Sequence, residues 1–318
     1  MLVTYIRSSS YNNFEYCQMQ YFMTYVLGHS TVSGKKAQLG TVVHKVMEVL
    51  AGCKKLLQDG DELLLEDDAI GEVEFTKRRL GTKKFVNEIL KRSYDHYTVP
   101  CTHHYTNADY KFCDKLTWEA LSYDDGNFDP RKRNIVAAEP QFDIPIEEDW
   151  AKYEYDMPEV SDGVIEVIDW KTGRRLNWAT GEEKTYEKLC KDPQLMLYHY
   201  AISKLFPEYD DAIMSIYFIR DGGPFSICFE ESDRQKFLGM LKDRFQEIKK
   251  TTRPRMLSRN QSHWKCQKLC DFCKKDWPGT DESMCRHVSN HLDQFGMLDT
   301  IQNCTREGFD VGYYEAPG

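Results

Sequence analysis

The stretch Gly163–Arg175, GVIEVIDWKTGRR, decides the fold of this 318-residue chain. Its apolar part, within Val164–Trp170, predicts a largely buried strand. Side chains alternate along a strand, so Asp169 and Lys171 are expected on the same face. A carboxylate and an ammonium beside apolar neighbours make a poor core, and the pair therefore predicts a functional site.

The elements around this strand predict an α/β fold with a mixed central sheet flanked by helices. Hydrophobic periodicity, N-cap residues and turn residues give their positions. The predicted helices are Leu39–Leu50, Asp192–Leu205 and a third from Ser232 to about Lys250, capped by Ser232 and Gln235; the predicted strands are Ile135–Ile146, Tyr153–Met157, Val164–Trp170, Ala212–Arg220 and Pro224–Glu230. Residues 55–134 look helical with loops, and the turn cluster Asp124–Arg133 is the predicted internal boundary.

Composition excludes several classes of protein. Lys and Arg number 42 against 51 Asp and Glu, and the net charge of −9 argues against a protein that coats nucleic acid non-specifically. The longest clean apolar stretch, Ala212–Ile219, is far shorter than the roughly 20 residues of a membrane helix. Met1–Ser10 lacks the apolar region of a secretory signal. With 11 cysteines and no export signal, a disulfide framework is a poor explanation, and we expect a cytoplasmic protein with no membrane partner.

The chemistry that suits Asp169 and Lys171 is metal-assisted hydrolysis of phosphodiesters. The carboxylate would bind Mg²⁺ or Mn²⁺, and the lysine would orient a water and offset charge on the phosphorane. The backbone carbonyl of Trp170 is a further candidate ligand. A second carboxylate is expected on the preceding strand, where Asp156 lies 13 residues upstream. Other candidate carboxylates are Glu139, Asp162 and Glu166.

Three ordered motifs make the chain resemble the RecB-like branch of the PD-(D/E)XK nucleases. DWKTG resembles the D-x-K motif of that family. Gln194 and Tyr198, one helical turn apart, resemble the Gln-x-x-x-Tyr helix that follows it. Gly40–His44 resembles the upstream helix whose histidine reaches the metal. The strand of the first carboxylate departs from the usual Gly-x-Ile-Asp, because Glu154–Met157 has no glycine.

The resemblance implies a restriction-endonuclease-like core and an exonuclease acting on DNA ends or single strands in recombination, repair or replication. A bacterial or phage-infected host cytoplasm would fit. Gln194 and Tyr198 would support the substrate, His44 would join the metal ligands, and Arg174 and Arg175 would contact DNA. The expected organisation is a helical N-terminal part (1–134), a nuclease core (135–255) and a Cys-rich C-terminal segment packing back on the core (256–318).

A second site is predicted by the cysteines near the C-terminal end. Cys266-x3-Cys270-x2-Cys273, then Cys285, indicates zinc or a [4Fe–4S] cluster, and His263 and His287 flank the group. The resemblance favours the cluster, since AddB-type and CRISPR-associated exonucleases hold one with a cysteine before the nuclease core and three after it. Cys17 stands at the early position. Five cysteines compete for four places: Cys17, Cys266, Cys270 and Cys285 are the first choice, with Cys273 in reserve.

The alternative to a nuclease is a DNA-binding or assembly subunit with a catalytically degenerate nuclease core, held together by an iron–sulphur or zinc site. The Walker A pattern is absent from the sequence, so a motor would come from a helicase or recombination partner.

Overall fold

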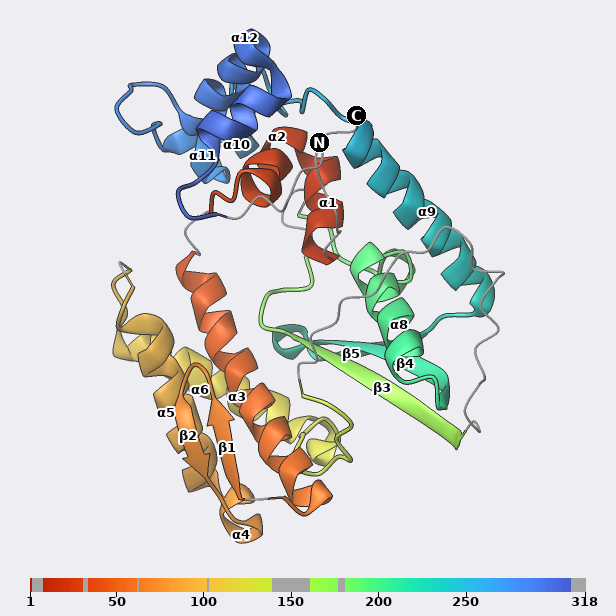
Figure 1. Ribbon diagram of the computed structural model, residues 1–318. Helices are drawn as coiled ribbons and strands as arrows, with labels where there is room; N and C mark the ends of the chain where they lie inside the picture. Colours follow the sequence, from red (N-terminus) through yellow and green to blue (C-terminus); the bar gives the residue numbers. More distant parts are fainter. Residues whose placement is uncertain are drawn as a thin grey trace.

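The computed structural model describes residue 1 and residues 8–30, 34–61, 63–101, 103–138, 161–176 and 181–309. A small mixed sheet lies between two groups of helices, and a third group forms one end of the molecule (Figure 1). The helices before the sheet are α1 (Ser8–Tyr16), α2 (Gln18–Tyr21), the π-helix Phe22–Val26, α3 (Lys35–Asp59), α4 (Lys77–Leu80), α5 (Lys83–Thr98) and α6 (Asn107–Ser122). Those after β3 are α7 (Tyr186–Leu189), α8 (Pro193–Leu205), α9 (Glu231–Lys250), α10 (Trp264–Lys268), α11 (Asp271–Lys274) and α12 (Met284–Cys304).

The central sheet has the order β3 (Ser161–Lys171), β4 (Tyr209–Phe218), β5 (Gly223–Cys228). β3 and β4 are parallel, joined through α8, whereas β4 and β5 form an antiparallel hairpin. The predicted mixed sheet is therefore confirmed, and its third predicted strand extends to Lys171. Residues 135–138, the start of an earlier predicted strand, are not in a strand, and the rest of the two earlier strands lies outside the described residues.

Local sequence signals determine where α8 begins and ends. Asp192 is the N-cap and accepts a hydrogen bond from the backbone N–H of Gln194 at 2.9 Å, with Pro193 in the first turn. The helix ends at Leu205, as predicted. For α9 the predicted capping box was wrong. Glu230 is the extended N-cap residue and forms the capping box with Asp233, because the helix starts two residues earlier than an N-cap at Ser232 predicts.

The sheet is covered by different helices on its two faces. Tyr217, Ile168 and Trp170 pack into the core formed by α3, α5 and α6. On the other face, Ile216 and Phe218 pack against α7 and α8. The far side of α8 then packs against α9 and α1 (Figure 1). Since side chains alternate along β3, Asp169 and Lys171 lie on the face that α8 covers.

The region between α3 and α6 contains a hairpin that the sequence analysis missed. β1 (Leu64–Asp67) pairs antiparallel with β2 (Gly71–Glu74). The Asp67 side chain accepts hydrogen bonds from the N–H groups of Ala69 and Ile70, both at 2.9 Å, which closes the turn. These strands are only four residues long and lack a clear alternation. The long helix α3 also extends beyond the predicted Leu39–Leu50 at both ends.

A separate core joins the two ends of the chain. Phe14, Met19 and Phe22 pack with Phe272 and Val288. The Cys-rich segment thus packs on α1, α2, the π-helix and the C-terminal part of α9 (Figure 1). Across the described ranges, no helix is both long and apolar enough to cross a membrane.

Candidate functional site

Asp169 and Lys171 form an ion pair at the carboxyl end of β3. Lys171 Nζ lies 2.7 Å from Asp169 Oδ2, and the two side chains are 30% and 14% exposed. That oxygen has no aligned hydrogen bond within the described residues, so the contact is chiefly electrostatic. Burial, the largest single effect, lowers the pKa of Lys171, but Asp169 together with Tyr198 and Asp192 outweighs it and raises the pKa above the ordinary 10.5. The pair therefore presents an ammonium beside an under-coordinated carboxylate oxygen.

His44 is brought to this pair by close packing between α3 and the turn after β3. Gly40 lies one helical turn before His44, and a Cβ built there would lie 2.6 Å from Thr172 Oγ1. Only glycine allows α3 to approach so closely. Burial lowers the pKa of His44 below the ordinary 6.5; Asp169 opposes this shift and Lys171 adds to it. The imidazole is thus neutral at neutral pH, with a nitrogen lone pair available to a metal.

Helix α8 supplies a third set of groups. Gln194 Nε2 donates a hydrogen bond to Tyr198 Oη at 2.9 Å, which holds the two predicted side chains together on one face. Tyr198 and Asp192 both lie close enough to Lys171 to raise its pKa. The N-terminal turn of α8 therefore lies close to the ion pair. Three motifs that are spread over residues 40–198 of the sequence meet here.

Glu166 and Trp170 lie on the opposite face of β3 from Asp169. Glu166 pairs with Arg133 and accepts a hydrogen bond from Ser215 Oγ at 2.5 Å. It therefore does not share a face with Asp169, as a metal ligand there would. The indole of Trp170 packs into the α3–α5–α6 core, which leaves its backbone carbonyl as the group that could reach a metal.

The other candidate carboxylates cannot be located. Asp156 and Glu139 lie outside the described residues, as does the side chain of Asp162. Among the residues that are described, no group of three or more His, Cys, Asp or Glu side chains is arranged to hold a metal ion. Within the described residues, the side chains near this site that could bind a metal are Asp169, His44 and Asp192.

The two arginines after the D-x-K motif differ in their surroundings. Arg175 pairs with Glu183, its backbone N–H donates to Asp221, and its guanidinium lies 4.9 Å from the centre of the Phe225 ring. Arg175 is thus held within the fold. Arg174 is exposed, so its charge is accessible to a ligand.

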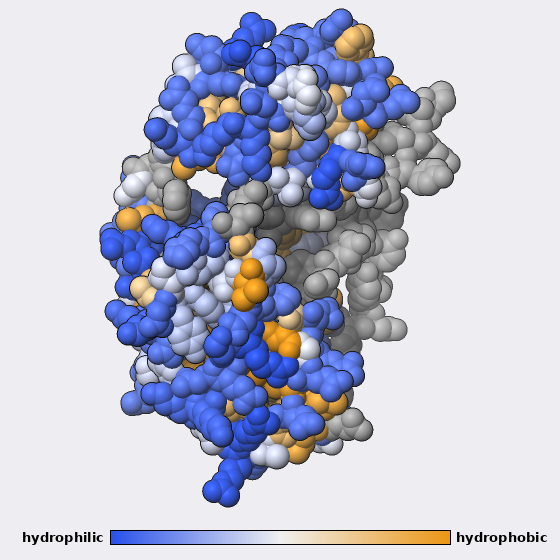
Figure 2. Space-filling model, turned by 90° about the vertical axis from the view of Figure 1, so that its left-hand side faces the viewer, coloured by the Kyte–Doolittle hydropathy of each residue, from blue (hydrophilic) through white to orange (hydrophobic). Residues whose placement is uncertain are grey.

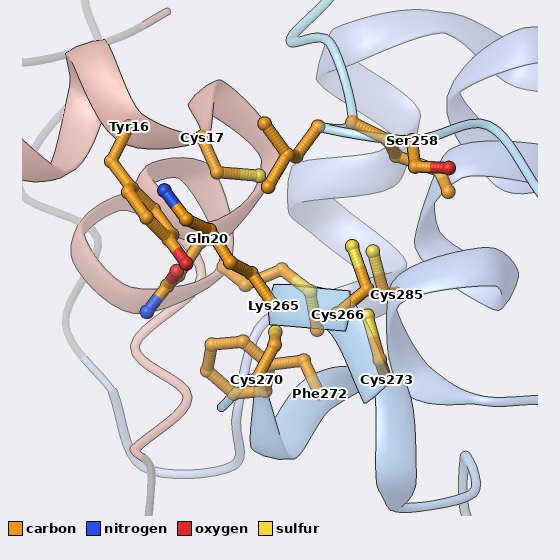
Figure 3. Close-up of a pocket in the computed structure, with 13 residues that line it drawn as sticks. Tyr16, Cys17, Gln20, Ser258, Lys265, Cys266, Cys270, Phe272, Cys273 and Cys285 are labelled. Carbon is orange, nitrogen blue, oxygen red and sulfur yellow. The ribbon is translucent and has the colours of Figure 1, made fainter. Parts of the chain in front are cut away.

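All five candidate cysteines line one pocket between the start of the chain and the C-terminal helices. Cys17 comes from the residue before α2, and the others come from α10, the N-cap and body of α11, and α12 (Figure 3). Cys273 is within hydrogen-bonding range of Cys266, Cys270 and Cys285. Cys273 is thus central to the group rather than peripheral to it.

The neighbouring histidines face elsewhere. His287 stacks on Trp277, with ring centroids 4.6 Å apart, and lies 3.5 Å from Glu282. His263 is the N-cap of α10 and accepts from the N–H of Lys265. Neither lines the pocket, whose metal-binding donors are all sulfur. Thiols are the ligand type of a [4Fe–4S] cluster or a Cys₄ zinc site, but the described cysteines are not arranged here as a group that could hold a metal ion.

Two contributors to the site were not singled out from the sequence. Thr172 is the residue that Gly40 accommodates. Asp192, expected only as a helix cap, also adds its charge to the surroundings of Lys171. Each lies within three residues of a motif residue. The sequence does not indicate which neighbours of a motif face the site, because that depends on how the helices and strands pack.

Comparison with known proteins agrees with this geometry. Residues 8–276 match the family described as the PD-(D/E)XK nuclease superfamily, and the match includes the three motifs and four of the five pocket cysteines. No curated protein and no solved structure shows significant similarity to the chain. The family match covers most of the chain and agrees with the mixed sheet and with the D-x-K pair at its edge. The chain therefore belongs to the PD-(D/E)XK nuclease superfamily, which indicates a metal-dependent nuclease with DNA as its substrate.

Proposed function

We propose that this protein is a Mg²⁺- or Mn²⁺-dependent exonuclease of the RecB-like branch, acting on DNA ends or single strands in recombination, repair or replication. The observation that carries the proposal is the Asp169–Lys171 pair at 2.7 Å, with α3 and α8 supplying His44, Gln194 and Tyr198 around it.

Asp169 would hold the metal, with His44, the Trp170 carbonyl and the carboxylates of Asp156 and Glu139 as further ligands. A bound divalent ion would polarise the phosphate and lower the pKa of an attached water. Because the raised pKa keeps Lys171 an ammonium, its role is to orient that water and offset negative charge in the transition state rather than to accept a proton.

The neighbours of Lys171 serve to position it. A cation on Asp169 would weaken the hold of that carboxylate on the lysine, since both positive groups compete for one oxygen. Asp192, whose carboxylate also acts on Lys171, and the neighbouring Tyr198 phenol would then keep the ammonium on the same side of β3. The hydrogen bond from Gln194 to Tyr198 fixes the phenol in this position.

A cleavage assay on end-labelled single- and double-stranded DNA, with Mg²⁺ and with Mn²⁺, tests the proposal. Lys171→Ala and Asp169→Ala are expected to lose cleavage by orders of magnitude while DNA binding persists. Lys91→Ala and Asp95→Ala, an exposed pair 2.5 Å apart on α5, are the matched controls and should cleave normally. A wild-type protein that degrades neither DNA with either metal would favour the degenerate DNA-binding or assembly subunit.

The exonuclease mode has its own test. An enzyme that needs DNA ends should degrade linear DNA and spare covalently closed circles of the same sequence. Equal cleavage of linear and circular single strands would instead indicate an endonuclease. Adding a candidate helicase to the linear duplex would show whether a motor partner supplies the single strand.

We further propose that the cysteine pocket holds a [4Fe–4S] cluster, as in the AddB-type and CRISPR-associated exonucleases. Support comes from the cysteines that line the pocket and from the central position of Cys273 among them. We therefore propose Cys266, Cys270, Cys273 and Cys285 as the ligands, with Cys17 as the fifth candidate. A cluster held by these four cysteines would cross-link α10, α11 and α12; with Cys17 as a ligand it would also link the start of the chain to residues about 250 positions later. Anaerobic purification with a visible absorption scan tests it; a colourless protein with one zinc per chain would contradict it.

A further inference from the structure

The segment between the end of α9 and the start of α12 carries an excess of positive charge. Residues 249–286 contain ten Lys or Arg and four Asp or Glu, in a chain whose net charge is −9. Arg253 and Lys274 form ion pairs with Asp293 and Asp271. The other eight make no ion pair with any carboxylate in the described part of the chain. Such a local excess in an acidic protein is the electrostatic footprint of an anionic ligand.

Aromatic rings lie within this basic segment, at α10. Trp264 is 45% exposed, and the ring of His263 stacks against it with an interplanar angle of 26°. Lys265 Nζ lies 5.9 Å from the centre of the Trp264 ring and 4.6 Å from that of Tyr16. The exposed Lys268 follows Trp264 by four residues, so the two side chains are neighbours on the surface of α10. Cations and an accessible indole thus alternate along one short stretch.

We propose that Trp264 and Lys268, with the basic residues around them, form a binding platform for single-stranded DNA. The proposal rests on the proposed function, because it supplies a second contact for the strand that the nuclease would cut. An exposed indole offers its face to an unpaired base, and the lysines offer charge to the phosphates. Paired bases in a duplex keep their faces covered, so stacking of this kind selects single strands.

The position of the platform suits a substrate-holding role. Cys266, also on α10, is buried against the cysteine pocket, whereas Trp264 and Lys268 are exposed. Helix α3, which carries His44 near its N-terminal end, begins on the side of the molecule nearest α10–α12 (Figure 1). The upper part of the face shown in Figure 2 is mainly hydrophilic, with small apolar groups between.

Binding of a dye-labelled oligothymidine, followed by fluorescence anisotropy in chelator so that no cleavage occurs, tests the platform on the anaerobically purified protein. Trp264→Ala is expected to weaken binding by about 5- to 150-fold, the range for loss of one stacked base. Trp264→Phe should keep most of the affinity, because it retains an aromatic face. Lys268→Gln should lower the slope of log K against log salt by about 0.7. The control is Phe295→Ala, a 53% exposed aromatic on α12 between Asp293 and Asp299, which should bind normally.

A direct contact is read from photo-crosslinking of an iodouracil-containing strand to the wild-type protein, where we expect the crosslinked peptide to contain Trp264. Unchanged affinity in Trp264→Ala, with crosslinks mapping elsewhere, would overturn the platform. So would Trp264-dependent binding to phosphatidylserine vesicles without binding to the oligonucleotide. Failure of the nuclease proposal can be told apart from failure of the platform. A wild type that binds the oligonucleotide through Trp264 but never cuts DNA would refute the proposed function and support the platform.

Discussion

Replacing Gly40 by alanine would test whether the contact between α3 and the D-x-K turn positions the site. The new Cβ would lie 2.6 Å from Thr172 Oγ1, where an ordinary contact begins near 3.4 Å. Either the Thr172 side chain or one of the two elements must therefore give by about 0.8 Å in a close-packed interior. Of the two other staggered rotamers of the threonine, one brings its methyl group into the same space and only the one that turns the Cβ hydrogen there relieves the contact.

Two effects of opposite sign determine the stability of Gly40→Ala. Alanine is favoured over glycine inside a helix by about 1 kcal/mol. Overpacking costs about 1–3 kcal/mol. The matched control is Gly239→Ala, in the exposed face of α9 with no atom within 4 Å of the new Cβ. We expect the control to gain about 1 kcal/mol and Gly40→Ala to fall about 1–3 kcal/mol below it in urea unfolding.

The effect on cleavage should exceed the effect on stability. A displacement approaching 1 Å of His44 from Asp169 and Lys171 would cost about 100-fold in rate while the protein stays folded. Adding Thr172→Ala removes the hydroxyl. The nearest remaining atom to the new Cβ at residue 40 is then the Cβ of residue 172, at an ordinary 3.8 Å. The double variant should recover both activity and about 1–3 kcal/mol of coupling energy. If the Gly40→Ala variant has the same cleavage rate and the same free energy of unfolding as Gly239→Ala, the reasoning is refuted.

Three further predictions concern stability, pH and the cysteine pocket. Asp129 is 2% exposed and lies 2.7 Å from Arg131, so Asp129→Ala leaves a mostly buried arginine unpaired and should lower the free energy of unfolding by about 3–5 kcal/mol. Asp95→Ala on the surface should lower it by under about 1 kcal/mol, and equal losses in chemical denaturation would contradict this. The pKa of His44 is lowered on folding, so as pH falls through 6.5 the unfolded chain takes up this proton before the folded one, and the wild type should lose stability relative to His44→Gln. A difference between the urea midpoints of the two proteins that stays constant from pH 7.5 to 5 would rule this out. Cys273→Ser should lose bound iron and lower the melting temperature, while the exposed Cys228→Ser should change neither, and full iron content in Cys273→Ser would exclude that residue as a ligand.

Local signals in the sequence were sufficient for the elements that carry the chemistry. The strand through Lys171, the helix opened by Asp192 and Pro193, and the two strands after it all begin and end within three residues of their predicted bounds. The reason is that caps, turns and alternation act over a few residues, and the interactions that fix these elements are themselves local. The short hairpin β1–β2 was missed because four-residue strands carry too little periodicity to be recognised.

The sequence by itself determined the residue types of the site and their order: a carboxylate and a lysine two apart, a glycine one turn before a histidine, and a glutamine one turn before a tyrosine. Only the tertiary structure decided which of these groups meet. It placed Glu166 on the far face of β3, committed Arg175 to Glu183 and Asp221, and put Cys273 at the centre of the thiols. These outcomes depend on the packing of α3, α8 and the C-terminal helices against partners distant in sequence, and no local pattern encodes those distances.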